Sequence, residues 1–248
     1  MRLDVYFGPA ELSPGELNGR VVAVIDVLRA STTIAAALFN GARSVIPFES
    51  SDEVIARSKS FERSDVLLAG ERKMLPISGF DLGNSPLEFT RAAIGGKTVL
   101  MTTTNGTMAL AAVTGARDTV VASYANYTAV LALLRAAARG DTDVSVLCSG
   151  TDRRFSLDDA ACAGRFVAAI ARDYPHATLN DAARTSVLLH ERYGDRIADV
   201  FADTVHGRLL ANAGFQGDLA ACATLDGYPV VPIYQERQIT KLGPERER

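Results

Sequence analysis

The fold is decided by a short stretch near the N-terminus, residues 21–32, which reads VVAVIDVLRAST. Five apolar residues, Val21–Ile25, are followed at once by Asp26. A continuous apolar run of this length is typical of a strand that is buried on both faces, as in the parallel sheets of α/β proteins. Ser31 or Thr32 can then cap a helix. The stretch therefore predicts a strand-to-helix unit of an α/β fold.

The same pattern recurs three more times along the chain. Apolar runs at Val66–Ala69, Thr98–Met101 and Val144–Leu147 stop in polar clusters that read GER (70–72), TTTNGT (102–107) and CSG (148–150). Ligands of open α/β sheets bind at the carboxyl ends of the strands. We therefore expect the four clusters to meet in one crevice.

Strand-like and helical segments alternate as far as Leu147, and the chain is then mostly helical to about Ala213. We predict a three-layer α/β/α fold with a mixed or largely parallel sheet and a helix-rich C-terminal portion. Ser85-Pro86-Leu87-Glu88 predicts a helix over Pro86–Ala93, and a second helix is expected over Asn105–Thr114. We expect residues 1–248 to form one unit and leave open a division into two lobes near residue 150.

Composition narrows the functional classes. The chain is 48% hydrophobic and 22% charged, with a formal net charge of −3 and scattered basic residues, so a nucleic-acid partner is not expected. No apolar stretch approaches the roughly 20 residues of a membrane helix, and the three cysteines lack metal-ligand spacing. We expect a cytoplasmic protein without a membrane partner that acts on a small molecule, and leave a homodimer open.

Carboxylates are the first candidates for chemistry. Asp26 leaves the sheet at the end of a strand, where a carboxylate is costly unless it binds a metal, an arginine or helix amides. Glu71 follows another strand, and Asp81 lies in a glycine-containing loop ten residues further on. The alternative for Asp26 is a helix cap or a partner for Arg29. The alternative for Glu71 is an exposed pair with Arg72.

Anion-binding groups surround these carboxylates in the sequence. Arginine can grip two oxygens of a phosphate or sulfonate, and hydroxyls, amides and helix N-termini can hold an oxyanion. The candidate substrate-binding residues share this chemistry and are Arg29, Ser31, Thr32, Arg72, Asn84, Ser85, Thr103, Thr104, Asn105, Gly106, Thr107, Ser149 and Gly150.

Cys148 is a candidate nucleophile. Cys148 and Arg154 have the spacing found in cysteine-dependent phosphatases, which form a phosphocysteine in an amide-lined cradle. Leu147 stands where those enzymes usually carry histidine, and Asp152 would add a negative charge to the cradle. We therefore rank this mechanism as a rival.

Several motifs, in order along nearly the whole chain, resemble the 2-phosphosulfolactate phosphatase family. They are Val24–Thr33, Ala69–Arg72, Gly79–Pro86, Thr102–Thr107, Cys148–Gly150, Ser156–Asp159 with Ala163-Gly164, and His206–Arg208 with Asp218. The resemblance implies a three-layer α/β fold and a magnesium-dependent hydrolase that removes the phosphate from a three-carbon sulfonated acid, as in coenzyme M biosynthesis.

These observations lead to one functional prediction and two alternatives. We predict a phosphatase in which Asp26, Glu71 and Asp81, with Asp159, hold Mg²⁺ against a phosphate oxygen. The substrate is 2-phosphosulfolactate or a related phosphorylated hydroxy acid. The rivals are catalysis through Cys148 and a non-catalytic protein that binds small sulfonated or phosphorylated acids.

Overall fold

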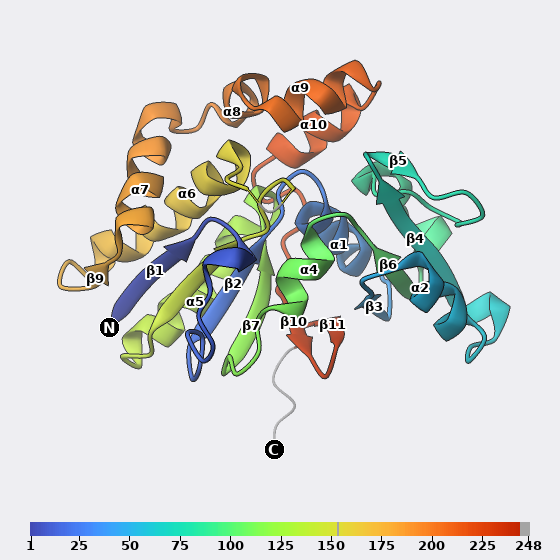
Figure 1. The fold of residues 1–248 in the computed structure, drawn as a ribbon, viewed down its shortest axis with the longest axis horizontal. Coiled ribbons are helices and arrows are strands. Elements are labelled where there is room, and N and C mark those ends of the chain that lie inside the picture. Colours follow the sequence, from blue (N-terminus) through green and yellow to red (C-terminus); the bar gives the residue numbers. More distant parts are fainter. Residues whose placement is uncertain (153, 244–248) are drawn as a thin grey trace.

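The computed structural model describes residues 1–152 and 154–243 (Figure 1). Its strands form a mixed sheet in the order β5-β4-β6-β3-β11-β10-β7-β2-β8-β1-β9. Their bounds are β1 Arg2–Tyr6, β2 Val21–Ile25, β3 Ser44–Pro47, β4 Val66–Arg72, β5 Leu75–Pro76, β6 Thr98–Thr102, β7 Asp118–Ala122, β8 Val144–Cys148, β9 Thr178–Leu179, β10 Pro232–Gln235 and β11 Gln238–Lys241. The predicted α/β class is confirmed.

The sheet consists of two blocks of parallel strands joined by a hairpin. Strands β4, β6 and β3 pair in parallel, as do β7, β2, β8, β1 and β9. The β10–β11 hairpin pairs antiparallel with β7 on one side and, through Ile239 opposite Val45, with β3 on the other. The apolar run at residues 230–234 predicts a single strand there, and nothing in the sequence pattern indicates the hairpin that connects the blocks.

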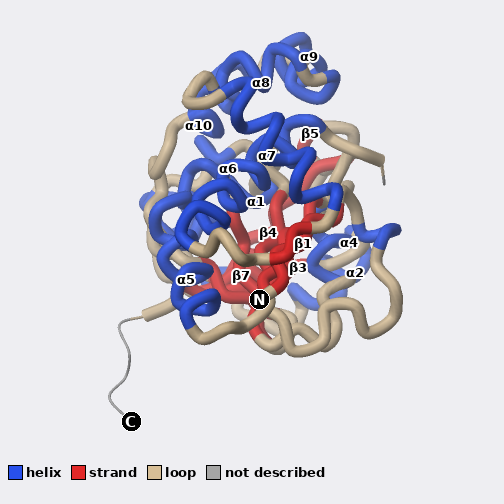
Figure 2. Tube along the Cα trace, turned by 90° about the vertical axis from the view of Figure 1, so that its left-hand side faces the viewer, coloured by secondary structure: helices blue, strands red, loops and turns tan. Residues whose placement is uncertain are grey.

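Helices cover both faces of the sheet. Their bounds are α1 Ala30–Phe39, α2 Ser51–Ser58, α3 Arg91–Ile94, α4 Gly106–Ala111, α5 Tyr127–Arg139, α6 Leu157–Asp173, α7 Asp181–Tyr193, α8 Ile197–Asp203, α9 Val205–Asn212 and α10 Gln216–Ala223. In the turned view the strands lie between α5 and α6 on one side and α2 and α4 on the other (Figure 2). In the described part of the chain, no helix combines the length and apolar character needed to cross a membrane.

Strand β2 shows why the sheet is covered twice. Its side chains alternate between two cores, because successive residues of a strand point to opposite faces. Val21, Ala23 and Ile25 belong to the core beneath α5 and α6, whereas Val22 and Val24 belong to the core beneath α1 and α4. The wholly apolar run that predicted a doubly buried strand is thus explained.

The C-terminal helices α8, α9 and α10 lie over one end of the sheet (Figure 1). Their packing is close, since a Cβ atom on Gly207 would lie 2.0 Å from the Phe201 carbonyl oxygen. Glycine at residue 207 therefore lets α9 approach α8. This packing brings α9 over the end of the sheet at which β2 finishes.

The helix predicted over Pro86–Ala93 is wrong. A 3₁₀ turn covers Pro86–Glu88, and a separate short helix, α3, follows. The Ser85 hydroxyl, expected to cap the helix, donates instead to Asp218 Oδ1 at 2.6 Å, and Glu88 Oε2 accepts from the Gly83 N–H at 2.6 Å. The distant Asp218 takes the first capping group, and Gly83 of the same loop takes the second. The helix expected over Asn105–Thr114 is present but shorter, as α4.

Candidate active site

A cavity of about 310 Å³ opens where the strand ends meet the C-terminal helices. Three of the four polar clusters found in the sequence contribute to its wall, and the segment after β8 contributes through Thr151 and Asp152, just beyond the cluster at residues 148–150. The lining residues are Asp26, Leu28, Arg29, Glu71, Lys73, Met74, Asn84, Thr104, Asn105, Thr151, Asp152, His206 and Leu209. The polar segments that follow β2, β4, β6 and β8 therefore do reach one crevice.

Asp26 both caps a helix and faces the cavity. Its Oδ1 accepts from the Ala30 N–H at 3.2 Å, and its own N–H donates to Ser31 Oγ at 2.8 Å, which together fix the first turn of α1. Burial, with a smaller contribution from the negative charges of Glu71 and Asp158, raises the pKa of the Asp26 carboxyl to about 7. The helix-cap alternative is thus real, but the carboxylate also borders the cavity.

Glu71 is the second carboxylate of the cavity and is only 7% exposed. Its Oε1 accepts from the Thr104 N–H at 2.7 Å, and its Oε2 accepts from the Met74 N–H at 2.9 Å. These two bonds join the end of β4 to the threonine loop after β6. Among the residues the structure describes, neither Asp26 nor Glu71 has a cationic side chain within salt-bridge distance.

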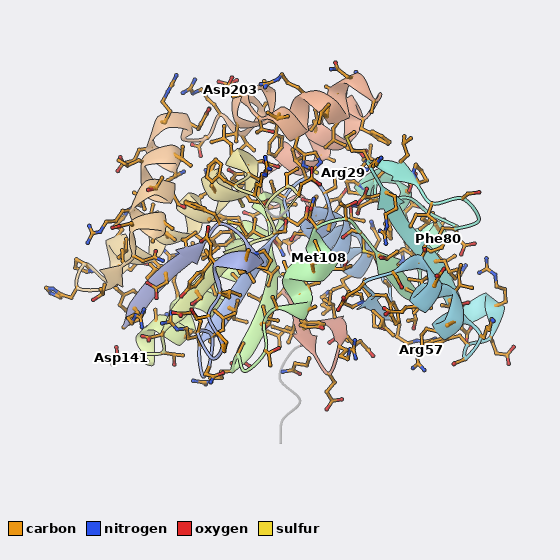
Figure 3. All side chains as sticks on the ribbon, viewed as in Figure 1. Arg29, Arg57, Phe80, Met108, Asp141 and Asp203 are labelled. Atoms are coloured by element: carbon orange, nitrogen blue, oxygen red, sulfur yellow. The ribbon has the colours of Figure 1, made fainter. Side chains whose placement is uncertain are left out.

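Arg29 is held firmly by the protein. It is 3% exposed, its Nη1 lies 2.5 Å from Asp218 Oδ2, and its Nη2 donates to the Met74 carbonyl oxygen at 2.8 Å. Its guanidinium also stacks 4.3 Å above the Phe215 ring. Figure 3 shows Arg29 just below the C-terminal helices. Arg29 therefore ties α1, the β4–β5 turn and α10 together at the cavity wall.

Arg72 and Asp81 do not line this cavity. Arg72 donates to the Glu71 carbonyl oxygen at 2.8 Å and to Thr102 Oγ1 at 2.9 Å. Asp81 is exposed, pairs with Arg63, and accepts from the Leu68 N–H at 2.9 Å. Both side chains thus have partners elsewhere on the molecule.

Lys73 and Met74 enter the cavity from the β4–β5 turn, and the sequence reading missed them. Both residues have positive φ angles, 50° and 71°. Non-glycine residues rarely adopt this conformation, so alternation along a strand gives no guide to where their side chains point. The only feature of the sequence that could have indicated Lys73 and Met74 as cavity residues is their position directly after Glu71 and Arg72.

The threonine loop after β6 contributes Thr104 and Asn105. Asn105 Oδ1 accepts from the Asp152 N–H at 3.2 Å, which links this loop to the one after β8. Thr103 and Thr107 bond each other, because Thr107 Oγ1 donates to the Thr103 carbonyl oxygen at 3.0 Å. A Cβ atom on Gly106 would lie 2.7 Å from Asp26 Oδ2, so glycine is needed where α4 meets Asp26.

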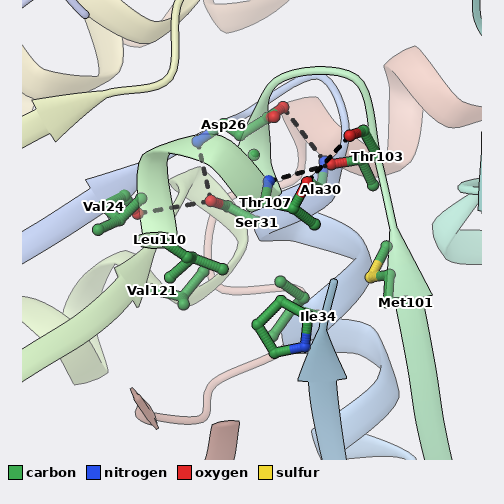
Figure 4. A pocket seen from close by; sticks show the side chains of 12 residues that line it. Val24, Asp26, Ala30, Ser31, Ile34, Met101, Thr103, Thr107, Leu110 and Val121 are labelled. Atoms are coloured by element: carbon green, nitrogen blue, oxygen red, sulfur yellow. Dashed lines mark hydrogen bonds between the residues drawn. The ribbon is translucent and has the colours of Figure 1, made fainter. Parts of the chain in front are cut away.

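Several other predicted anion binders are used by the fold. Ser31, Thr103, Gly106 and Thr107 line a separate, largely apolar cavity of about 10 Å³ (Figure 4). Thr32 donates to the Val27 carbonyl oxygen at 3.0 Å. Ser85, as described above, donates to Asp218. These hydroxyls satisfy neighbouring groups at the base of the site.

The loop after β8 is filled by the protein's own carboxylate. Asp159 accepts from the Val27 N–H at 2.9 Å and from both the Ser149 hydroxyl and the Gly150 N–H at 3.0 Å. Burial, then the negative charges of Asp158 and Asp26, raise its pKa well above the usual range. The Ser149-Gly150 turn is thus occupied by the protein's own Asp159 carboxyl group, which points toward these donors.

Cys148 is not exposed to the cavity. It is the last residue of β8, its exposure is 0%, and burial raises the pKa of its thiol well above the usual range. A nucleophilic cysteine needs an accessible thiolate. The phosphocysteine alternative is therefore disfavoured by the structure.

His206 is a cavity residue that was noted in the sequence but not included among the predicted site residues. It lies on α9, and its Nδ1 is 3.9 Å from Asp158 Oδ2. Asp158 in turn accepts from the Ser156 hydroxyl. Only the packing of α9 over the sheet brings His206 to the site, and that packing is not visible in the sequence.

The donor set of the cavity fits a magnesium ion. Within the described ranges, no group of three or more His, Cys, Asp or Glu residues is arranged to hold a metal. Mg²⁺ nevertheless prefers oxygen ligands, retains several waters, and is commonly held by one or two carboxylates together with substrate phosphate. Asp26 and Glu71 supply two such carboxylates, and among the described residues neither has a cationic partner; burial, and then the negative charge of Glu71, raise the pKa of Asp26.

A family model and individual relatives both match this chain and carry the same description. The sequence pattern of the family described as 2-phosphosulpholactate phosphatase matches residues 6–237. A relative from Symbiobacterium thermophilum is 42% identical over 238 residues, which cover 96% of this chain and 99% of the relative. A relative from Caldanaerobacter subterraneus is 37% identical over 232 residues, covering 94% and 95% of the two chains. Both relatives are named probable 2-phosphosulfolactate phosphatases.

Proposed function

Because the chain belongs to the 2-phosphosulfolactate phosphatase family, we propose that it hydrolyses the phosphate monoester of 2-phosphosulfolactate to sulfolactate and phosphate. A related phosphorylated hydroxy acid is included in the proposal. One observation supports it most directly: the same cavity of about 310 Å³ is lined by Asp26, Glu71, Arg29 and Lys73. Oxygen ligands for a cation and groups that favour anions thus face one small space.

Asp26 and Glu71 would hold Mg²⁺. When bound, the ion supplies positive charge that neutralises the transferred phosphoryl group and orients water. The backbone N–H groups of Thr104 and Met74 keep the Glu71 carboxylate in place, and α1 keeps Asp26 in place. The carboxylates are therefore fixed before any ligand arrives, which lowers the cost of ordering the site.

Lys73 and Arg29 serve the anionic substrate in different ways. The Lys73 ammonium reaches the cavity from an exposed turn, where it attracts anions into the site. The Arg29 guanidinium is held by Asp218 and Met74, so its N–H groups keep a fixed orientation at the cavity wall while Asp218 balances its charge. Water is the favoured attacking group, since the Cys148 thiol is buried.

A phosphate-release assay tests this function. We expect 2-phosphosulfolactate to be hydrolysed in the presence of Mg²⁺, activity to be lost after treatment with EDTA, and activity to return when Mg²⁺ is restored. Full activity of the metal-free protein would contradict the assignment of Asp26 and Glu71. Binding of sulfolactate without any phosphate release would identify a binding protein instead.

The role in coenzyme M biosynthesis is also a proposal and rests on the resemblance to the family. It predicts that cells lacking this protein accumulate 2-phosphosulfolactate. Normal levels of this metabolite in such cells would assign the protein another physiological substrate.

A further inference from the structure

Two buried polar atoms of the cavity have no hydrogen-bond partner among the described residues. They are Asn84 Oδ1 and Thr104 Oγ1. Asn84 is only 5% exposed. Buried side-chain amides are nearly always hydrogen-bonded, because leaving one unpaired costs its desolvation. An unpaired amide in the wall of a binding cavity indicates that a ligand supplies the missing partner.

The two atoms belong to different sides of the cavity. Thr104 is joined to the carboxylate side, since its N–H donates to Glu71 Oε1 at 2.7 Å. Asn84 is joined to the guanidinium side, because the next residue, Ser85, donates to Asp218 Oδ1 while Asp218 Oδ2 pairs with Arg29. The cavity therefore has a carboxylate side and a guanidinium side.

The backbone of Asn84 is held rigidly. Thr33 on α1 donates its hydroxyl to the Asn84 carbonyl oxygen at 2.9 Å. Together with the bond from Ser85 to Asp218, this fixes the segment between α1 and α10. The amide of Asn84 is thus presented by a firm scaffold, and it can offer either its oxygen or its NH₂ group by turning about its last bond.

We propose that Asn84 is a specificity-determining residue that reads the second acid group of the substrate. This inference rests on the proposed function. Phosphate and Mg²⁺ belong at the carboxylate side, where Thr104 offers a hydroxyl, because Asp26 and Glu71 repel any anion that arrives without a cation. The sulfonate or carboxylate of the same small molecule then extends to the guanidinium side. There, with its amide turned so that the NH₂ group takes the place of the unpaired Oδ1, Asn84 donates to an acid oxygen next to Arg29.

Three phosphate monoesters separate this role from phosphate binding. 2-Phosphosulfolactate carries a sulfonate and a carboxylate, 2-phospholactate lacks the sulfonate, and isopropyl phosphate lacks both. The Asn84→Leu variant keeps the size of the side chain and removes its hydrogen bonds. We expect kcat/KM for 2-phosphosulfolactate to fall about 10- to 100-fold, mainly through KM, and kcat/KM for isopropyl phosphate to change less than about threefold. The result for 2-phospholactate tells which acid group is read.

Two further variants serve as matched controls. Thr104→Val removes the other unpaired atom and should weaken all three substrates alike. Asn40→Leu changes an asparagine outside the cavity, whose amide donates to the Phe89 carbonyl oxygen at 2.8 Å, and should leave kcat/KM unchanged. Thermal melting distinguishes the two asparagines as well. Loss of an unpaired amide at Asn84 should not lower Tm, whereas loss of the Asn40 bond should.

Equal losses on all three substrates, or no loss on any, would overturn the assignment of Asn84. Failure of the unmodified protein to hydrolyse any of the three in Mg²⁺ would overturn the proposed function instead. In that case calorimetry decides the inference by itself: Asn84→Leu should weaken the binding of sulfolactate about 10-fold or more and leave inorganic phosphate unaffected. If Asn84→Leu does not fold, Asn84→Ala takes its place in the same measurements.

Discussion

The junctions after β2 and β8 share a pattern of buried strand, polar turn and helix, but only the first leaves its aspartate at the large cavity. Each strand is buried, each is followed by a polar turn and a helix, and each junction carries a buried aspartate, Asp26 or Asp159. Asp26 accepts one backbone hydrogen bond, at Oδ1, and borders the large cavity. Asp159 accepts from two backbone N–H groups and a hydroxyl and does not border that cavity.

The difference shows that a loop resembling an anion site is available to a ligand only where the chain has not filled it. At the β8 junction, Asp159 occupies the donors of Ser149 and Gly150. At the β2 junction, α1 uses one carboxylate oxygen of Asp26 and the cavity is next to the residue. We therefore expect substitutions at Asp26 to affect activity and substitutions at Asp159 to affect stability.

The largest expected effect is on turnover. Asp26→Asn keeps an oxygen that can accept from the Ala30 N–H but removes the charge that would hold Mg²⁺. We expect kcat/KM to fall roughly 100-fold or more, with a folded protein of normal circular dichroism. The assay is phosphate release at saturating Mg²⁺. An unchanged rate would leave Asp26 only its role as a helix cap.

The second prediction concerns pH and the metal-free protein. Burial raises the pKa of Asp26 to about 7, above its value in the unfolded chain, so the folded state binds the proton more tightly. The stabilising contribution is therefore complete below the unfolded pKa of roughly 4 and is lost as pH rises toward 7. We expect the wild-type protein to lose roughly 2 kcal/mol more stability than Asp26→Asn between pH 5 and 8. Denaturant melts in EDTA measure this, and equal slopes would contradict it.

The third prediction concerns the closed junction. Asp159→Asn replaces one acceptor oxygen with an NH₂ group, so at least one donor among Val27, Ser149 and Gly150 loses its partner. A buried donor without a partner costs about 1–3 kcal/mol, which corresponds to a Tm lower by roughly 2–12 °C in a chain of this size. Well below that Tm, kcat/KM should stay within about fivefold of wild type. A stable variant without activity would place Asp159 in the chemistry, as the sequence reading supposed.

The sequence was sufficient for the local features of the fold. Continuous apolar runs predicted buried strands such as Val21–Ile25, because full burial on both faces leaves no alternation. Features that depend on distant partners could not be predicted in this way. Ser85 looked like a helix cap, yet Asp218, 133 residues away, takes its hydroxyl.

The candidate site shows the same division. The sequence predicted Asp26 and Glu71 as site residues because each directly follows an apolar strand. It predicted Asn84 because its amide lies just before an expected helix N-terminus. Lys73 could not, since its side chain points into the cavity only because of a left-handed backbone conformation. His206 reaches the site through the packing of α9, which depends on the close contact of Gly207 with Phe201.

The smallest expected effect is at Cys148, which tests whether the β8 junction takes any part in the reaction. Its thiol is fully buried, and burial keeps its pKa well above the usual range, so it stays protonated and out of reach of the cavity. Cys148→Ala should cost about 1 kcal/mol of stability for the lost sulfur and leave kcat within about threefold of wild type. Phosphate release and a thermal melt provide both values. A folded Cys148→Ala protein that binds substrate but has no turnover, with a phosphocysteine trapped in the native enzyme, would show that the junction opens during catalysis and that Asp159 leaves its donors to the phosphate.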